Sequence, residues 1–368
     1  MLEATLAKLR KSPTLRRTLR RKNRRRVDDP LIHVGIRKAA STFLQHRFNT
    51  AVNVRTATME ELELRLFDAV IDGADPESFV RGARARFRPY WNMPHVPGSK
   101  YIVSNERFAI NPRMMKFVPN DEHAPAAYER FWAMQIGSLK ACFPEGRVLM
   151  LTRSPASWVK SVYSQAVRGA IAHRRFPGFV RARSEYLRQN LQYQRMRERF
   201  IEAFGEDRVL LLPQELLKSD PERFFEMLSD FSGISMKPLK DNQIPREAHN
   251  ASPSPRELDV LVNSWRVLRL LDKYGRRPES AFYQRYVDPR VKKVERVYKT
   301  YYRNNIEFRL DHTERAWDIT VASLDEPTVE VDRFDEIGSL IEEVAEQCRF
   351  LTGLPGYESC GSVYDLGV

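Results

Sequence analysis

Four short apolar runs stand out along the chain, each followed by polar or turn-forming residues. Runs of this length predict strands that are buried on both faces of a parallel sheet. They cover residues 31–35, 101–104, 148–152 and 209–212. Helices are predicted over 41–50, 58–71, 124–141 and 184–204. Strands that alternate with helices predict an α/β fold, with a central parallel sheet and helices on both faces.

The first predicted strand runs into a short loop, and the predicted helix 41–50 follows it directly. The loop carries Lys38, and Ser41 and Thr42 begin the helix. Backbone N–H groups in a first helical turn have no intrahelical partner and lie at the positive end of the helix dipole. The segment therefore predicts a binding site for phosphate or sulfate.

This loop differs from the Walker A motif of nucleotide triphosphatases. That motif requires a second glycine and a lysine directly before the hydroxyl residue that ligates Mg²⁺. Here Lys38 precedes Ser41 by three positions, and no second glycine is present. The pattern argues against an ATPase or a metal-dependent kinase.

A second candidate anion site follows the strand 148–152. Arg153 comes directly after the strand, and Ser161 lies eight residues further along, in a segment expected to be helical. Arginine offers a planar fork of N–H donors to phosphate oxygens, and a serine hydroxyl adds another donor. The pair therefore predicts a second phosphate contact.

Together the two motifs resemble those of sulfotransferases that use 3′-phosphoadenosine 5′-phosphosulfate (PAPS). The segment 38–43 is similar to their 5′-phosphosulfate loop, and Arg153 with Ser161 is similar to their 3′-phosphate motif. The resemblance extends over residues 30–308 and implies a P-loop-like sulfotransferase fold, PAPS as co-substrate and no metal. Its implied donor-binding residues are Arg37, Lys38, Ala39, Ala40, Ser41, Thr42, Phe43, Arg153 and Ser161.

The resemblance also implies roles for individual side chains. Lys38 is expected beside the bridging oxygen, where it meets the negative charge that develops on the departing phosphate. The loop departs from the family pattern at Ala40, where glycine is usual, and at Arg37, where proline is common. If position 40 requires a positive φ, alanine is strained there.

Two residues are candidates for the general base that activates the acceptor hydroxyl. Glu106 follows the strand 101–104, and a Ser-x-Glu at this place resembles the base-bearing segment of bacterial and heparan sulfate sulfotransferases. His95 lies in a proline-flanked loop and is the rival, because other branches of the family use a histidine at a similar distance from the lysine. Glu106 is the preferred base. His33, within the first strand, is expected to be a structural imidazole.

The expected reaction is in-line sulfuryl transfer to a hydroxyl group of a carbohydrate or glycolipid acceptor. Residues 79–91 are rich in arginine and aromatic side chains and contain Pro89, which predicts an irregular loop region. Aromatic rings can stack on sugar rings, and arginines can pair with anionic groups. Loops set on a rigid sheet are where substrate selection usually resides.

The net charge of +13 is concentrated at the N-terminus. Residues 1–26 hold 11 of the 61 basic side chains and one of the 48 acidic ones, so the rest of the chain is nearly neutral. A basic arm with leucines at helical intervals either lies on an anionic membrane surface or is simply solvated. An alternative function follows, that of a non-catalytic protein docking on membrane or nucleic acid through residues 8–26.

We predict three regions, namely a basic arm over 1–27, a sulfotransferase-like domain over 28–308 and an extension over 309–368 packed on that domain. The three cysteines are odd in number and include no C-x-x-C pair, which favours reduced thiols in the cytoplasm, although Cys348 and Cys360 remain a possible pair. No apolar run approaches the roughly 20 residues of a membrane span. We therefore expect a cytoplasmic protein, with peripheral contact to the inner membrane face as an option.

Overall fold

The computed structural model describes residues 29–36, 39–57, 60–87, 96–105, 114–115, 118, 120–168, 172, 174–236, 258, 262 and 348–358. The chain divides into two compact units. The first comprises Met1–Ser154, Arg188–Pro238 and Val344–Gly367, and the second comprises Pro155–Leu187, Leu239–Glu343 and Val368. The predicted N-terminal arm lies outside the described residues, as does the predicted C-terminal extension apart from 348–358.

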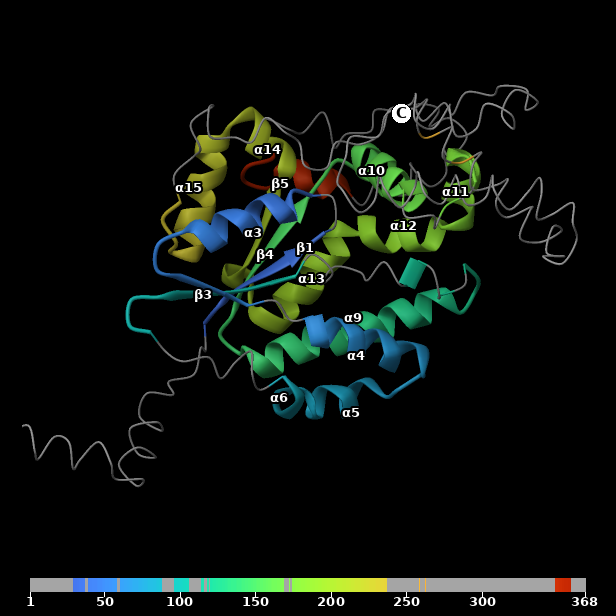
Figure 1. The fold of residues 1–368 in the computed structure, drawn as a ribbon, viewed down its shortest axis with the longest axis horizontal. Helices are drawn as coiled ribbons and strands as arrows, with labels where there is room; N and C mark the ends of the chain where they lie inside the picture. The colour runs from blue at the N-terminus through green and yellow to red at the C-terminus, as the bar shows by residue number, and fades with distance from the viewer. Residues whose placement is uncertain are drawn as a thin grey trace, which may run out of the picture. The chain divides into compact units, whose positions relative to one another are not determined.

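The first unit is built on a parallel sheet with the strand order β2-β3-β1-β4-β5 (Figure 1). Its strands are β1 (Leu31–Gly35), β2 (Val54–Ala57), β3 (Lys100–Asn105), β4 (Arg147–Thr152) and β5 (Val209–Pro213). Every residue of β1 is buried, as is every residue of β3 and β4 after the first. The apolar runs form strands because, in the centre of a covered sheet, both faces of each strand are removed from water.

Helices cover both faces of this sheet (Figure 1). On one face lie α3 (Ser41–Thr50) and α15 (Pro221–Ser232), joined by a ring contact of 6.5 Å between Phe43 and Phe225. The other face carries α4 (Glu60–Ile71), α5 (Pro76–Arg81), α6 (Ala83–Arg86), α9 (Ala124–Cys142) and α13 (Tyr193–Phe204). The division follows from the right-handedness of crossover connections between parallel strands. The connection through α3 leads from β1 towards β2, whereas the connections to β3, β4 and β5 lead in the opposite direction along the sheet.

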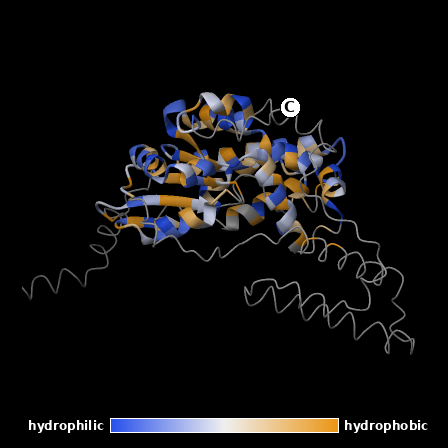
Figure 2. Cartoon of the chain, turned by 90° about the horizontal axis from the view of Figure 1, so that it is seen from above, coloured by the Kyte–Doolittle hydropathy of each residue, from blue (hydrophilic) through white to orange (hydrophobic). Residues whose placement is uncertain are grey.

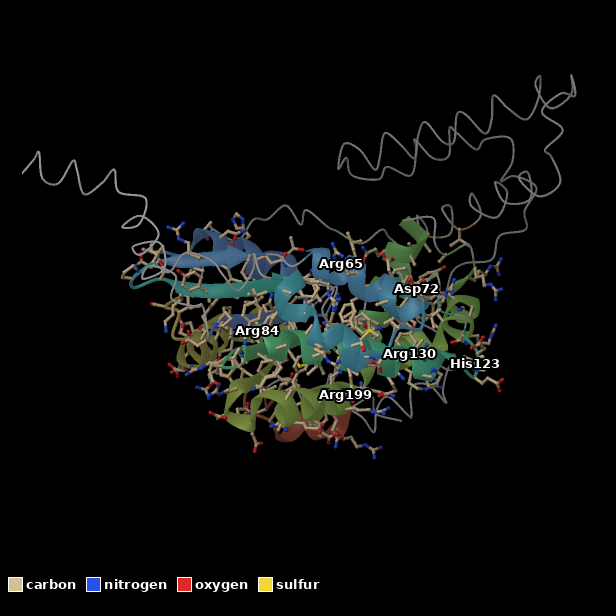
Figure 3. All side chains as sticks on the ribbon, turned by 90° about the horizontal axis from the view of Figure 1, so that it is seen from below. Arg65, Asp72, Arg84, His123, Arg130 and Arg199 are labelled. Atoms are coloured by element: carbon tan, nitrogen blue, oxygen red, sulfur yellow. The ribbon has the colours of Figure 1, made fainter. Side chains whose placement is uncertain are left out.

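The helices carry hydrophobic and hydrophilic residues along the same length, as amphipathic helices that cover a sheet do (Figure 2). On α9, the buried Trp132 meets Phe131 and Phe200 edge to face, with ring centroids 5.8 and 6.4 Å apart. Basic side chains border this layer, among them Arg84, Arg130 and Arg199 (Figure 3). The Arg199 guanidinium bonds the Glu129 carboxylate at 2.5 and 2.7 Å, so that its charge is paired within the fold.

The second unit is described through its helices α10 (Pro155–Arg168) and α11 (Phe176–Ala182) and the first residues of α12 (Ser184–Leu191). Trp158 of α10 stacks on Tyr186 of α12, with ring centroids 6.5 Å apart. Tyr163 packs against Phe176 and Phe179, at 5.2 Å from each ring. These aromatic contacts fix α10 against the two helices that follow it.

The four predicted strands and the predicted α/β class are confirmed, and β5 extends through Pro213. Two helical expectations need correction. The predicted helix 184–204 is two helices, α12 and α13, separated by Gln192 with φ −74° and ψ 60°. The irregular region expected over 79–91 is helical up to Arg86, since Asp75 caps α5 by accepting the N–H of Ser78 at 2.8 Å.

The same region affects the predicted acceptor contacts. Phe79 and Phe87 are buried, and the Arg86 guanidinium lies 4.5 Å from the centre of the Phe79 ring. The two phenylalanine rings are therefore part of the core rather than exposed platforms for a sugar. Residues 88–95 lie outside the described part of the chain.

Candidate active site

The carboxyl ends of β1, β3 and β4 meet at one edge of the sheet. β1 lies between the other two strands and is parallel to both, with Val34 opposite Asn105 and Gly35 opposite Leu151. The connection that leaves β1 leads along the sheet to β2, whereas the connection that leaves β4 leads in the opposite direction, to β5. In open α/β sheets, ligands bind in the crevice where connections diverge in this way. The register therefore brings the end of β1, which the donor loop follows, and the end of β4, which Arg153 follows, to the same edge.

The loop after β1 turns sharply before α3 begins. The Ala39 N–H donates to the Ile36 carbonyl oxygen at 3.1 Å, and Ala40 adopts the left-handed conformation with φ 60° and ψ 16°. The condition stated above for Ala40 is thus met, and a residue with a Cβ occupies a position that favours glycine. Arg37 and Lys38 lie outside the described residues.

The amino end of α3 suits an anion. No side chain caps it, its first turn contains no acidic residue, and the first intrahelical bond runs from the Leu44 N–H to the Ala40 carbonyl oxygen. The N–H groups of Ser41, Thr42 and Phe43 are thus those that an α-helix leaves without an intrahelical partner. Ser41 is buried and its hydroxyl donates to the Ile36 carbonyl oxygen at 3.4 Å, whereas Thr42 is exposed.

Arg153 directly follows β4, and neighbouring side chains hold its main chain. The Tyr193 hydroxyl donates to the Arg153 carbonyl oxygen at 2.9 Å, and the Ser154 N–H donates to Glu215 Oε1 at 3.0 Å. Glu215 belongs to α14 (Gln214–Ser219). Arg153 is half-buried, so part of its side chain faces solvent.

The remaining predicted site residues are distributed as follows. Ser161 is buried in α10, within the second unit. Glu106 follows Asn105, the last residue of β3, in the sequence, and both Glu106 and His95 lie outside the described residues. The roles of these three residues stay predictions.

A buried polar cluster links β1, β3 and α3. His33 Nδ1 lies 2.8 Å from Ser104 Oγ, which also accepts the amide N–H of Gln45 at 3.1 Å. Burial lowers the pKa of His33 to about 4, so its ring is neutral at physiological pH. His33 thus has the character of a structural imidazole, with Nε2 buried and without a hydrogen-bond partner.

Sequence reasoning did not identify Tyr193, Glu215 or Tyr357 as part of the site. Tyr193 belongs to the apolar stripe of a predicted helix, and the stripe predicts burial of the ring without indicating what its hydroxyl binds. Glu215 follows the carboxyl end of a strand, where ligands bind in open α/β sheets, so its position could have identified it as a candidate. Tyr357 comes from far along the chain, and its hydroxyl lies 2.5 Å from Thr152 Oγ1 in β4.

Among the described residues, no cluster of three or more His, Cys, Asp or Glu side chains is placed to hold a metal ion. Within the same residues, no helix combines the length and apolar character that crossing a bilayer requires.

Comparison with known proteins agrees with the motifs. A model of the sulfotransferase family matches residues 30–238, more than half of the chain. Among solved structures, a sulfotransferase from Alicyclobacillus acidocaldarius is similar at 15% identity, a TM-score of 0.39, and coverage of 67% of this chain and 96% of that one. Sulfotransferase STF9 from Mycobacterium avium is similar at 14% identity, a TM-score of 0.32, and coverage of 82% and 78%. No curated protein matches. On the family match, the chain belongs to the sulfotransferase family and is an enzyme rather than a non-catalytic docking protein.

Proposed function

We propose that this sulfotransferase moves a sulfuryl group from PAPS to a hydroxyl group of a carbohydrate or glycolipid acceptor. The observation that supports the proposal is the parallel pairing of β1 and β4. It brings the uncapped amino end of α3 and the strand end bearing Arg153 to one edge of the sheet. A nucleotide with phosphates at both the 5′ and 3′ positions needs two such anion sites close together.

The first site fits a 5′-phosphosulfate. The N–H groups of the first turn of α3 would hold the phosphate oxygens, and the exposed Thr42 hydroxyl adds a donor. Ser41 is already engaged with Ile36, so its contribution is through the main chain. We assign Lys38 the role of neutralising the charge that develops on the leaving phosphate, which positively charged groups stabilise more in the transition state than in the ground state.

The second site is assigned to the 3′-phosphate. The Arg153 guanidinium would donate to it in a fork, and the Ser161 hydroxyl is the second proposed ligand. In the transfer step, the bond between sulfur and the 5′-phosphate oxygen breaks and its electron pair stays on that oxygen. A bond forms between sulfur and the acceptor oxygen, while the acceptor proton passes to the general base.

Glu106 is the proposed base, with His95 as its rival. Asn105, which precedes Glu106 in the sequence, is the buried last residue of β3, the strand beside β1. A base must come within hydrogen-bond reach of the acceptor proton, and the carboxyl end of β3 lies at the edge where the donor is proposed to bind. The proposal of a carbohydrate or glycolipid acceptor is supported by the residue types of Arg88, Tyr90 and Trp91. Aromatic rings suit contact with sugar rings, and arginine suits contact with anionic groups.

The proposal is tested by incubating the protein with PAPS labelled in its sulfuryl group and a panel of glycan, glycolipid and phenolic acceptors. We expect label on glycans or glycolipids, and a loss of about 10²–10³-fold in kcat for Lys38→Ala. Transfer to phenols alone would refute the acceptor class. Absence of PAPS turnover with every acceptor, together with no binding of 3′-phosphoadenosine 5′-phosphate, would refute the donor.

We also propose that the enzyme acts in the cytoplasm, with the basic residues of segment 8–26 touching an anionic membrane. Lipid-linked acceptors would then be presented at the surface where the enzyme is concentrated. The charge of that segment supports the proposal, since basic residues near an anionic surface contribute about 1 kcal/mol each.

A further inference from the structure

The peptide group between Arg153 and Ser154 is bound by side chains at both of its polar atoms. Its carbonyl oxygen accepts the Tyr193 hydroxyl at 2.9 Å, and its N–H donates to Glu215 Oε1 at 3.0 Å. Tyr193 begins α13, and Glu215 lies in the first turn of α14, so these two residues come from the elements on either side of β5. A peptide group held on both sides resists rotation, which fixes the direction in which Arg153 leaves the strand.

The Tyr193 hydroxyl keeps its proton under all physiological conditions. Tyr193 is completely buried, and this burial raises the pKa of its hydroxyl well above the ordinary value. The negative charge of Glu215 raises the pKa further. A neutral tyrosine donates its proton to one acceptor, so the bond to the Arg153 carbonyl oxygen does not depend on pH.

A third side chain reaches the same strand end from the C-terminal part of the chain. The Tyr357 hydroxyl lies 2.5 Å from Thr152 Oγ1, and both residues are fully buried. Thr152 is the residue before Arg153. The segment that bears Tyr357 lies beyond residues 30–238, the part that the family model matches.

That C-terminal segment is anchored in the first unit. Cys348 is buried, and its Sγ contacts the Leu191 carbonyl oxygen at 4.0 Å. Leu351 is buried in the short helix η5 (Phe350–Gly353), and Gly356 takes φ 87°. A Cβ at Gly356 would lie 3.1 Å from Met227 Sδ, which shows how closely the segment approaches α15. The C-terminal segment thus packs against the first unit and holds Tyr357 beside β4.

We propose that Tyr193, Glu215 and Tyr357 are positioning residues of the donor site: Tyr193 and Glu215 hold the peptide group between Arg153 and Ser154, and Tyr357 holds the side chain of Thr152, so that Arg153 is oriented for the 3′-phosphate. The inference rests on the proposed function, because it takes Arg153 as the 3′-phosphate ligand. A guanidinium that is oriented before binding loses less freedom when the ligand arrives. The three residues therefore favour nucleotides with a 3′-phosphate over those without one.

Calorimetric titration of the full chain separates positioning from general stability. The two ligands are 3′-phosphoadenosine 5′-phosphate and adenosine 5′-monophosphate, which lacks the 3′-phosphate. We expect Tyr193→Phe and Tyr357→Phe each to weaken binding of the first ligand about five-fold, the effect of losing one hydrogen bond, and to leave the second unchanged. Thermal unfolding verifies that each variant is folded.

Tyr101→Phe is the matched control. Tyr101 is a buried tyrosine at the amino end of β3, and its hydroxyl accepts the Val96 N–H at 2.7 Å. The substitution removes the same hydroxyl from the opposite end of the sheet, and we expect it to leave both affinities unchanged. Glu215 offers a second comparison, in which Glu215→Gln keeps an acceptor oxygen and retains binding while Glu215→Ala loses about five-fold.

Each outcome has a distinct meaning. If Arg153→Ala weakens only the 3′-phosphorylated ligand while the two tyrosine variants change neither affinity, or change both equally, the positioning role is refuted and the donor site stands. If Arg153→Ala leaves both affinities unchanged, the proposed donor site itself fails. If Tyr193→Phe does not fold, Tyr357→Phe and the Glu215 pair decide the inference.

Discussion

His33 Nδ1 and Ser104 Oγ lie 2.8 Å apart, in a hydrogen bond that joins neighbouring residues of β1 and β3 in the interior. Gln45 of α3 donates to the same hydroxyl, so the helix that follows the donor loop is tied to both strands. Phe48 covers the imidazole edge to face at 5.8 Å. The cluster therefore anchors the helix whose amino end is the proposed 5′-phosphate site.

The buried imidazole predicts a specific loss of stability in acid. The folded state binds a proton at His33 only near pH 4, whereas the unfolded chain binds one near pH 6.5. Between these values the unfolded state holds more protons, so the stability contributed by neutral His33 is present above pH 6.5 and is lost as the pH falls towards 4. The full effect of such a shift is about 3 kcal/mol.

Urea unfolding between pH 4.5 and pH 7 measures this effect in the wild type and in His33→Gln. The glutamine carries no titrating group, so we expect a flatter pH dependence for the variant. The contributions of all other titrating groups are the same in both proteins, so they cancel in the difference between the two curves. Parallel curves for the two proteins would show that His33 does not contribute.

Ala40 makes a prediction about the donor loop. Its φ of 60° places an alanine in the left-handed region, which disfavours residues with a Cβ by about 1–2 kcal/mol. Ala40→Gly removes this strain but adds freedom to the unfolded chain, so we expect a net stabilisation of about 0.5–1 kcal/mol.

Ala39→Gly is the control for this change. Ala39 is fully buried, and its φ is not positive. The same substitution one residue earlier relieves no strain, and we expect it to lower the free energy of unfolding. Denaturant titrations of both variants give the two signs, and destabilisation by Ala40→Gly would contradict the strain argument.

The strands were predictable where burial alone determines the pattern. β1, β4 and β5 are nearly continuous apolar runs because both of their faces are covered, but β2 has Arg55 and Thr56 exposed and has no such run. The break at Gln192 was hidden because buried residues recur at helical spacing on both sides of it, with Leu187 and Leu191 before it and Met196 and Phe200 after it. Periodicity reports which residues are buried and not whether the helix axis continues.

The same distinction holds for the site. The strand and the helix start of each predicted anion motif could be predicted because they follow one another directly in the sequence. The residues that hold Arg153 could not, because Tyr193 and Tyr357 act through hydroxyl groups brought in from other elements. Nothing in the local sequence of either tyrosine indicates its partner.

The buried thiols predict low chemical reactivity. Burial raises the pKa of both Cys142 and Cys348 to about 12 from 9.0. Only the thiolate reacts with alkylating reagents, so we expect labelling by iodoacetamide at pH 8 to be slower than for an exposed thiol by about 10³-fold. Mass spectrometry after labelling of native and urea-unfolded protein measures both rates.

Cys348 has additional value as a reporter for the C-terminal segment. Its reaction requires the segment that bears Tyr357 to leave the first unit, whereas Cys142 lies within α9. Saturating 3′-phosphoadenosine 5′-phosphate is expected to slow labelling of Cys348 more than that of Cys142. Rapid labelling of Cys348 in the native protein would contradict the packing of the C-terminal segment against the first unit.

The basic arm predicts binding to anionic vesicles by the full chain. Replacing Arg16, Arg17, Arg20 and Arg21 by glutamate removes four positive charges worth about 1 kcal/mol each and adds four negative ones, so we expect sedimentation with phosphatidylserine vesicles to weaken by at least two orders of magnitude. Replacing the same four residues by lysine preserves the charge and should preserve binding. Equal sedimentation of both variants would refute the membrane contact.

The choice between Glu106 and His95 predicts different losses of turnover. As general base, Glu106 contributes about 10²–10⁴-fold to kcat, and Glu106→Gln keeps the shape of the side chain while removing its basicity. We expect that loss in kcat with no change in the affinity for 3′-phosphoadenosine 5′-phosphate, because the base acts on the acceptor. His95→Ala should retain kcat within about ten-fold, an effect below the range of a missing base. The reverse pattern, in which turnover survives Glu106→Gln and is lost in His95→Ala, assigns the base to His95, since only the group that removes the acceptor proton has so large an effect on the chemical step.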